Sequence, residues 1–246
     1  MSNWNFYIKN FVAYLKIERS LSSNSVEAYL HDVQLLVQYL NIEKNMVNPE
    51  DLMLNDFENF IAHLHDLGLS DRSQARIISG LKAFYKYLLT DDFISEDPTS
   101  LLEGPKLGKK LPDTLSFEEI ETLIGALDLS KAENVRNKAM LETLYSSGLR
   151  VSELINLQIS HIYKEVSFIR VIGKGNKERL IPIGSEALKQ IEIYLEHVRN
   201  TLPQYPKYSD VLFLNKRGKP ISRVMVFLVI KKLVKKINLN KNISPH

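Results

Sequence analysis

With 246 residues, of which 44% are hydrophobic and 25% charged, the chain can form one large or two ordinary globular domains. The sequence contains no cysteine, which excludes disulfide bonds, thiolate metal sites and a cysteine nucleophile. Neither a signal-type N-terminus nor an apolar run of about 18 residues is present, so we expect a cytoplasmic protein without membrane insertion.

The net charge of +3 hides two oppositely charged parts. Residues 1–100 contain 8 Lys and Arg against 14 Asp and Glu, whereas residues 101–246 contain 24 against 15. Residues 211–246 hold nine basic side chains and no carboxylate. Basic helix faces can simply be solvated, but such faces normally mix both signs. The asymmetry therefore favours a polyanionic partner, most often nucleic acid.

Four amphipathic helices are predicted in the first hundred residues, over 6–17, 22–40, 55–67 and 72–89. The second begins with Ser and Asn caps, and the third opens on the capping residue Asn55. At 100° per residue, one arc of the fourth helix is apolar, with Ile77, Ile78, Leu81, Phe84, Tyr85 and Leu88. The opposite arc holds Arg72, Arg76, Ser79, Lys82 and Lys86. This basic face is either solvated or lies along DNA; we favour DNA, because positive charge in this half is concentrated here.

A break in the pattern over 91–112 contains the domain boundary, because prolines, glycines and lysines replace the helical periodicity. We predict a helical domain over 1–104, a linker over 105–112 and a second domain over 113–246. The second domain begins with a helix capped by Ser116, and helices continue to about Tyr145. Strands are expected over 166–172 and 178–183, then a helix over 185–199, a short strand over 211–214 and a basic helix over 222–237 whose apolar face includes Phe227. The fold class is thus mainly α with a small antiparallel sheet.

Arg150 lies between two predicted helices, because the first ends at Gly148 and the second starts within a few residues. The helix dipole disfavours a cation at a helix N-terminus. The placement is favourable if an anion binds there, since free helix N–H groups and a guanidinium could meet one phosphate. A solvated arginine in a turn is the alternative.

Lys174 lies in the stretch GKGNK, which joins the two predicted strands and is typical of a hairpin turn. Most hairpin lysines are solvated, and Lys174 alone indicates little. Together with Arg150 and the basic surroundings, it suggests a site for a phosphate.

The order and spacing of GLRVSEL and VIGKGNKERLIPIG resemble the tyrosine recombinases, in particular the Xer recombinases of bacteria. The similarity extends over nearly the whole chain, including ARIISGLKAFYKYL, DPTSLLEGPKLGKKLPDTLSFEEIETLI and the terminal SPH. It implies an N-terminal four-helix core-binding domain and a C-terminal mixed α/β catalytic domain that together enclose duplex DNA.

By this resemblance, the catalytic residues are Arg150, Lys174 and His246, with Glu153 in support. Arg150 would stabilise charge on the phosphate, Lys174 would act as general acid, and Glu153 would orient a basic neighbour. Glu153 could instead be an ordinary first-turn carboxylate. The DNA-binding residues would be Arg72, Arg76, Lys82, Lys86 and Lys177. No metal or other cofactor is implied.

The family pattern continues beyond His246 with an arginine, a further histidine or tryptophan and the nucleophilic tyrosine. We therefore expect this chain to be C-terminally truncated and catalytically incomplete. The implied function is chromosome-dimer resolution at a dif-like site by a homo- or heterotetramer of recombinases, with a septal DNA translocase as partner. A phage, transposon or integron integrase on the same fold, or a non-catalytic DNA-binding fragment, are the alternatives.

Overall fold

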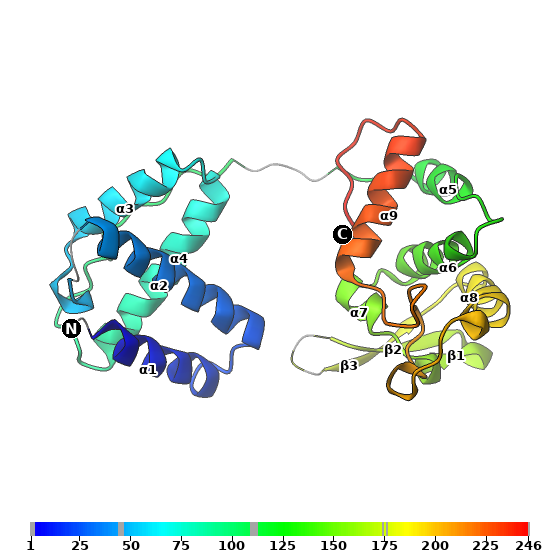
Figure 1. The fold of residues 1–246 in the computed structure, drawn as a ribbon, viewed down its shortest axis with the longest axis horizontal. Coiled ribbons are helices and arrows are strands. Elements are labelled where there is room, and N and C mark those ends of the chain that lie inside the picture. The colour runs from blue at the N-terminus through cyan, green and yellow to red at the C-terminus, as the bar shows by residue number, and fades with distance from the viewer. Residues whose placement is uncertain (1–2, 44–46, 109–112, 174, 176, 246) are drawn as a thin grey trace. The chain divides into compact units, whose positions relative to one another are not determined.

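The computed structural model describes residues 3–43, 47–108, 113–173, 175 and 177–245. The chain divides into two compact units, residues 1–110 and 111–246, each with its own hydrophobic core (Figure 1). None of the described helices is long and apolar enough to cross a membrane.

The described residues of the first unit form four α-helices, whose buried stripes follow the helical periodicity predicted above. They are α1 (Trp4–Ile17), α2 (Ser23–Glu43), α3 (Leu54–Asp66) and α4 (Asp71–Thr90). The six apolar residues predicted for one arc of α4 are all buried. Aromatic rings fill much of the core, where Trp4 stacks on Phe84 and Phe57 meets Tyr85 edge-on. Each helix is therefore stabilised mainly by packing its apolar face against the others.

Helices α2 and α4 approach each other closely at Gly80. A Cβ atom at this position would lie 2.3 Å from Asp32 Oδ2, so no larger side chain fits without movement. Asp32 is buried, and its carboxylate pairs with the guanidinium of Arg76 at 2.6 and 2.7 Å. The missing side chain at Gly80 thus makes room for a buried ion pair between the helices.

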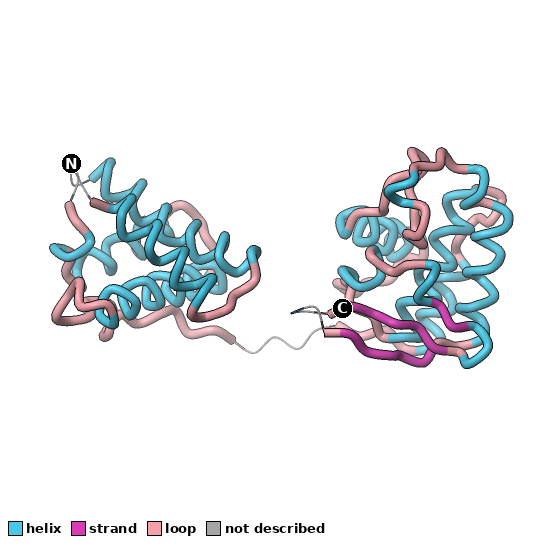
Figure 2. Tube along the Cα trace, turned by 90° about the horizontal axis from the view of Figure 1, so that it is seen from below, coloured by secondary structure: helices cyan, strands magenta, loops and turns pink. Residues whose placement is uncertain are grey.

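In the part of the second unit that the structure describes, a small sheet lies beside five α-helices. The helices are α5 (Phe117–Gly125), α6 (Ala132–Ser147), α7 (Val151–Ile155), α8 (Ser185–His197) and α9 (Arg223–Lys236). Three antiparallel strands, β1 (Ile162–Tyr163), β2 (Phe168–Ile172) and β3 (Glu178–Pro182), are ordered β1-β2-β3. Figure 2 shows these strands together along one side of the unit. The prediction of a mainly α fold with a small antiparallel sheet is confirmed.

Several predicted helix ends have the expected local chemistry. The Ser116 hydroxyl accepts the N–H of Glu119, and the Glu119 carboxylate accepts the N–H of Ser116, which forms a complete capping box. Ser222 caps α9 in the same way through the N–H of Met225. Gly148 ends α6 with a positive φ of 57°.

The predicted strand over 211–214 is wrong. This segment forms only isolated bridges, Gln158 to Val211 and Leu214 to Pro220. Its carbonyls are instead bound by a side chain, because the buried Arg199 donates to the carbonyls of Val211 and Leu212 as well as to those of Tyr208 and Ser209. The guanidinium of Arg199 thus donates the hydrogen bonds to the Val211 and Leu212 carbonyls that a neighbouring strand would otherwise donate.

Three smaller expectations also need correction. Met53, not Asn55, is the N-cap of α3, and Asp56 accepts its backbone N–H. Val166 lies in a 3-10 turn rather than in a strand. Phe227, which the periodicity placed on the core face of α9, is 40% exposed.

Candidate active site

The connection between α6 and α7 fixes the position of Arg150. After the left-handed turn at Gly148, Leu149 is buried in the core and Arg150 has an extended backbone as the N-cap of α7. The backbone therefore enters α7 from a defined direction, while the side chain of Arg150 remains 67% exposed.

Glu153 lies one turn further on and is buried, with its side chain only 2% exposed. Its Oε2 accepts the backbone N–H of Arg150 at 2.9 Å, and its Oε1 lies 3.2 Å from Arg150 Nη1. We expected free helix N–H groups at this position to face an anion; the N–H of Arg150 is bound by Glu153 instead. The guanidinium of Arg150 thus contacts a buried carboxylate through Nη1, while most of the side chain is exposed to solvent.

Arg179 on β3 is a second partner of Glu153, which the sequence analysis missed. Its Nη1 donates to Oε1 at 2.8 Å and its Nη2 to Oε2 at 2.9 Å. Arg179 is paired in register with Val171, whose side chain is buried. Directly opposed residues share a face of an antiparallel sheet. An arginine on the core side of a strand was therefore the available signal, because a charge there needs a partner.

The protonation state of Glu153 follows from these contacts. Burial by itself raises the pKa of a carboxyl group. Here the hydrogen bonds from Arg179 and from the backbone and guanidinium of Arg150 outweigh burial, and the pKa of Glu153 is lowered. Glu153 is therefore a carboxylate at neutral pH, flanked by two guanidinium groups.

The β2–β3 hairpin begins directly beside this cluster. The N–H of Gly173 donates to the carbonyl of Lys177 at 2.8 Å, and Gly175 has a φ of +75°, which favours glycine. A Cβ at Gly173 would lie 3.1 Å from Arg179 Nη1 and 3.5 Å from Glu153 Oε1. Lys177 is exposed. Lys174, predicted as catalytic, lies outside the described residues.

The segment that leads to His246 is attached to the start of the unit. Lys241 Nζ binds Glu119 at 2.7 Å and the carbonyl of Thr114 at 3.0 Å, and the Asn242 N–H donates to Asp113 at 2.9 Å. Ile243 is buried in the core. These contacts fix the chain up to the last few residues; His246 itself lies outside the described residues.

The basic face of α4 differs in one respect from the predicted one. Arg72 and Lys86 are exposed, and Lys82 is half-buried. Arg76 is 49% exposed but bound to the buried Asp32. Its guanidinium is therefore held in place rather than freely solvated.

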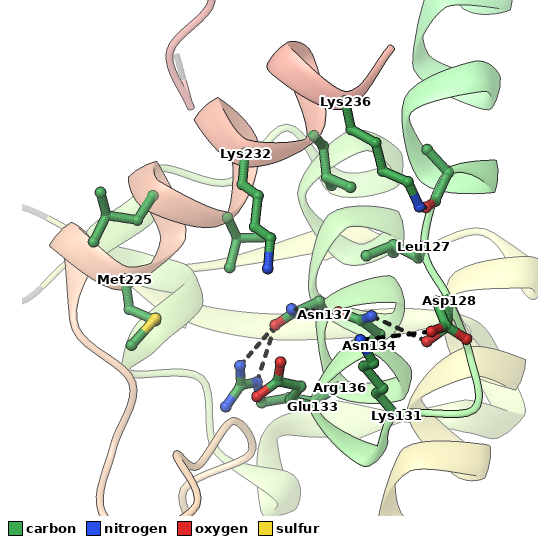
Figure 3. A pocket seen from close by; sticks show the side chains of 14 residues that line it. Leu127, Asp128, Lys131, Glu133, Asn134, Arg136, Asn137, Met225, Lys232 and Lys236 are labelled. Atoms are coloured by element: carbon green, nitrogen blue, oxygen red, sulfur yellow. Dashed lines mark hydrogen bonds and ion pairs between the residues drawn. The ribbon is translucent and has the colours of Figure 1, made fainter.

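A separate cavity of about 380 Å³ lies between the start of α6 and α9 (Figure 3). Lys232 and Lys236 reach over it from α9, and the buried Arg136 in its wall binds Asn137 and the carbonyl of Leu214. None of the Glu153 cluster lines it. Across the described residues, no group of three or more His, Asp or Glu side chains is placed to hold a metal ion.

Two family matches account for most of the chain. Residues 8–91 match the phage integrase N-terminal SAM-like domain, and residues 113–246 match the phage integrase family itself. The chain belongs to the phage integrase family. It is a tyrosine recombinase, a DNA strand-exchange enzyme in its full-length form.

Two relatives show which tyrosine recombinases this chain is similar to. It is 38% identical over 243 residues to the tyrosine recombinase XerD of Listeria monocytogenes, covering 98% of this chain and 82% of that protein. It is 36% identical over 246 residues to XerD of Halalkalibacterium halodurans, covering 100% and 82%. The chain thus spans about four-fifths of the length of these relatives.

Solved structures share the fold. The pre-cleavage complex of the XerH site-specific recombinase with a difH substrate has a TM-score of 0.74 at 17% identity, covering 96% of this chain and 80% of that one. The Tn1549 transposon integrase bound to circular intermediate DNA has a TM-score of 0.73 at 20% identity, covering 97% and 83%. The predicted two-domain tyrosine-recombinase fold is therefore confirmed.

Proposed function

We propose that Arg150, Lys174 and His246 form the phosphate site of a Xer-type recombinase and that Glu153 positions Arg150. The observation that carries this proposal is the exposed guanidinium of Arg150, which stands on a buried carboxylate beside a glycine-flanked hairpin. A guanidinium fixed in advance can meet phosphate charge without reorganisation in the transition state.

The reaction that fits is a transesterification. A tyrosine oxygen attacks the scissile phosphorus, a 3′-phosphotyrosyl bond forms, and the bond to the 5′-oxygen breaks. The energy of the phosphodiester is retained in the covalent intermediate, and the freed 5′-hydroxyl of another strand can reverse the step. Arg150 offsets charge on the non-bridging oxygens. Lys174 donates the proton that the leaving 5′-oxygen needs, and His246 hydrogen-bonds the phosphate.

Duplex DNA would be bound largely through its backbone. Arg72, Arg76, Lys82 and Lys86 form the basic face of α4, and Lys177 is exposed at the base of the hairpin. Arg72 and Arg76 are closest to the start of α4, the part of a helix that often meets bases in a groove. Because counterions are released on binding, affinity should fall steeply with salt.

The proposed task is chromosome-dimer resolution at a dif-like site. The curated relatives at 36–38% identity support it, since they are named XerD. The Tn1549 and lambda integrases also share the fold, but at 16–20% identity they do not favour an integrase over a Xer recombinase. A tetramer on paired sites is supported by one similar structure, that of a lambda integrase tetramer bound to a Holliday junction. A septal DNA translocase is the proposed activator, and the cytoplasm the proposed location.

The test uses a protein of the relatives' full length and a duplex containing the dif-like site, nicked so that cleavage traps the covalent adduct. Arg150→Ala should lower the single-turnover cleavage rate by about 10³-fold or more. Lys174→Ala should be equally slow, but a substrate with sulfur as the 5′-leaving atom should restore it, because a thiolate needs no general acid. Lys164→Ala is the matched control, since Lys164 pairs with Glu192 on the surface. Unchanged cleavage by Arg150→Ala would refute the proposal.

A further inference from the structure

Four donors satisfy the carboxylate of Glu153, and two of them come from Arg179. Oε1 is shared by Arg150 Nη1 and Arg179 Nη1, and Oε2 by the Arg150 backbone N–H and Arg179 Nη2. A buried carboxylate with fewer partners would be destabilised, because no donor would replace the water that it loses on burial. These four hydrogen bonds therefore stabilise the negative charge of the buried Glu153 side chain.

The two arginines do not contribute equally. Arg179 binds with two parallel contacts of 2.8 and 2.9 Å, which is the strong bidentate geometry of a guanidinium on a carboxylate. The guanidinium of Arg150 makes one contact, and that one is longer, at 3.2 Å. Arg179 thus supplies most of the side-chain compensation. Arg150 is oriented by Glu153 but keeps most of its donors for another anion.

Arg179 also connects the hairpin to the α6–α7 turn. It is the second residue of β3, two positions after Lys177, whose carbonyl closes the hairpin base with Gly173. Gly173 has no side chain, and an added Cβ would be 3.1 Å from Arg179 Nη1. The start of the hairpin, the ion pair and the N-terminus of α7 are therefore in direct contact.

We propose that Arg179 is a positioning residue for strand cleavage: it neutralises Glu153 so that Arg150 remains available to the phosphate, and it fixes the base of the β2–β3 hairpin, at Gly173, beside Glu153. This inference rests on the function proposed above. Because Arg179 acts through Glu153 in this proposal, its loss should lower the rate of cleavage more than the affinity for DNA.

The experiment compares variants of the full-length recombinase in single-turnover cleavage at saturating protein, with the dissociation constant for DNA measured separately. Arg179→Gln removes the ion pair, and Arg179→Lys keeps the charge but loses the bidentate geometry. Arg170→Gln is the matched control: Arg170 lies on the neighbouring strand, contacts His161 and Glu178 rather than Glu153, and is 37% exposed, against 41% for Arg179. The double variant Arg179→Gln/Glu153→Gln tests whether Arg179 acts through Glu153.

We expect Arg179→Gln to slow cleavage at least tenfold with less than a threefold change in DNA affinity, and Arg170→Gln to cleave like the wild type. Arg179→Lys should recover part of the rate. The double variant should be no slower than Glu153→Gln alone. Melting temperature and circular dichroism show whether Arg179→Gln folds. If it does not, the cleavage rate and the DNA affinity of Arg179→Lys are compared in the same way to test the role of Arg179.

Three results would overturn the inference: wild-type cleavage by the folded variants, a loss confined to DNA affinity, or independent multiplication of the defects in the double variant. Failure of the underlying function looks different, because Arg150→Ala would then cleave normally. If Arg150→Ala is inactive and the Arg179 variants cleave normally, only the role of Arg179 is refuted.

Discussion

Replacing Gly80 by alanine should destabilise the first unit, although the same change stabilises most helix interiors. The added Cβ would lie 2.3 Å from Asp32 Oδ2, 2.8 Å from its Cβ and 2.9 Å from its Cγ. The carboxylate cannot rotate away cheaply, because it is buried and paired with Arg76 at 2.6 and 2.7 Å. Either α2 and α4 separate or the ion pair breaks.

The magnitude follows from three opposing effects. Alanine gains about 1 kcal/mol of helix propensity over glycine. Overpacking costs about 1–3 kcal/mol, and loss of a buried ion-pair partner about 3–5 kcal/mol when the pair breaks completely. Because Arg76 is half exposed, we take the lower part of that range and expect a net loss of about 2–4 kcal/mol. For a domain of this size that corresponds to a fall in Tm of about 10–20 °C.

Fluorescence of Trp4 measures this effect in the first unit alone, since it is the single tryptophan of the chain and stacks on Phe84 of α4. Gly104→Ala is the control within the same unit, because a Cβ there would make only an ordinary contact, 3.5 Å from Ile78 Cδ1. In an Asp32→Ala background, Gly80→Ala should cost less, since two of the three crowded atoms are gone. A Tm within 3 °C of the wild type, or an equal cost in both backgrounds, would refute the steric reasoning.

Three further predictions concern the second unit. Arg199→Met should lower its urea-unfolding free energy by about 3 kcal/mol or more, because four carbonyls lose a hydrogen bond from the guanidinium and, among the described residues, only that of Tyr208 keeps a backbone donor, the N–H of Val211; a loss below 1 kcal/mol would contradict this. Gly173→Ala should crowd the Arg179–Glu153 pair and slow cleavage while DNA affinity is kept, as measured in the single-turnover assay. The lowered pKa of Glu153 means that its contribution to stability is complete above the unfolded value near 4.5 and is lost as pH falls through the folded pKa. The unfolding free energy of Glu153→Gln should therefore fall less steeply below about pH 4.5 than that of the wild type; equal slopes would show that Glu153 is not the group responsible.

Features set by neighbouring residues were predictable from the sequence. The Ser116 and Ser222 caps, the left-handed end of α6 at Gly148 and the apolar arc of α4 all depend on contacts within a few residues. They follow from helical periodicity and capping chemistry alone. The family resemblance added the positions of Arg150 and Glu153, and the fold it implied is confirmed.

Pairings between distant residues were not predictable in this way. Arg179 is 26 residues from Glu153, and Arg76 is 44 residues from Asp32. The basic face of α4 was read as four equivalent cations, because nothing local distinguishes an arginine that lies over a buried carboxylate. The segment 211–214 was read as a strand for a similar reason. Its β-branched and aromatic composition favours a strand, but its carbonyls are bound by the side chain of Arg199.

The buried carboxylates of Asp32 and Glu153 differ in the number of hydrogen bonds that they accept. The side chains of Asp32 and Glu153 are equally buried, each 2% exposed. Asp32 Oδ2 accepts a hydrogen bond from Arg76 Nη1 at 2.7 Å, whereas Oδ1 lies 2.6 Å from Nη2 without a hydrogen-bond partner among the described residues. Burial raises the pKa of Asp32. Glu153 has a bidentate contact with Arg179 and also the N–H and guanidinium of Arg150, and its pKa is lowered. Burial therefore outweighs the single hydrogen bond at Asp32, whereas the hydrogen bonds from Arg179 and Arg150 outweigh burial at Glu153. If Arg150 had to neutralise Glu153 alone, its guanidinium would be drawn onto the carboxylate and fewer donors would remain for a phosphate.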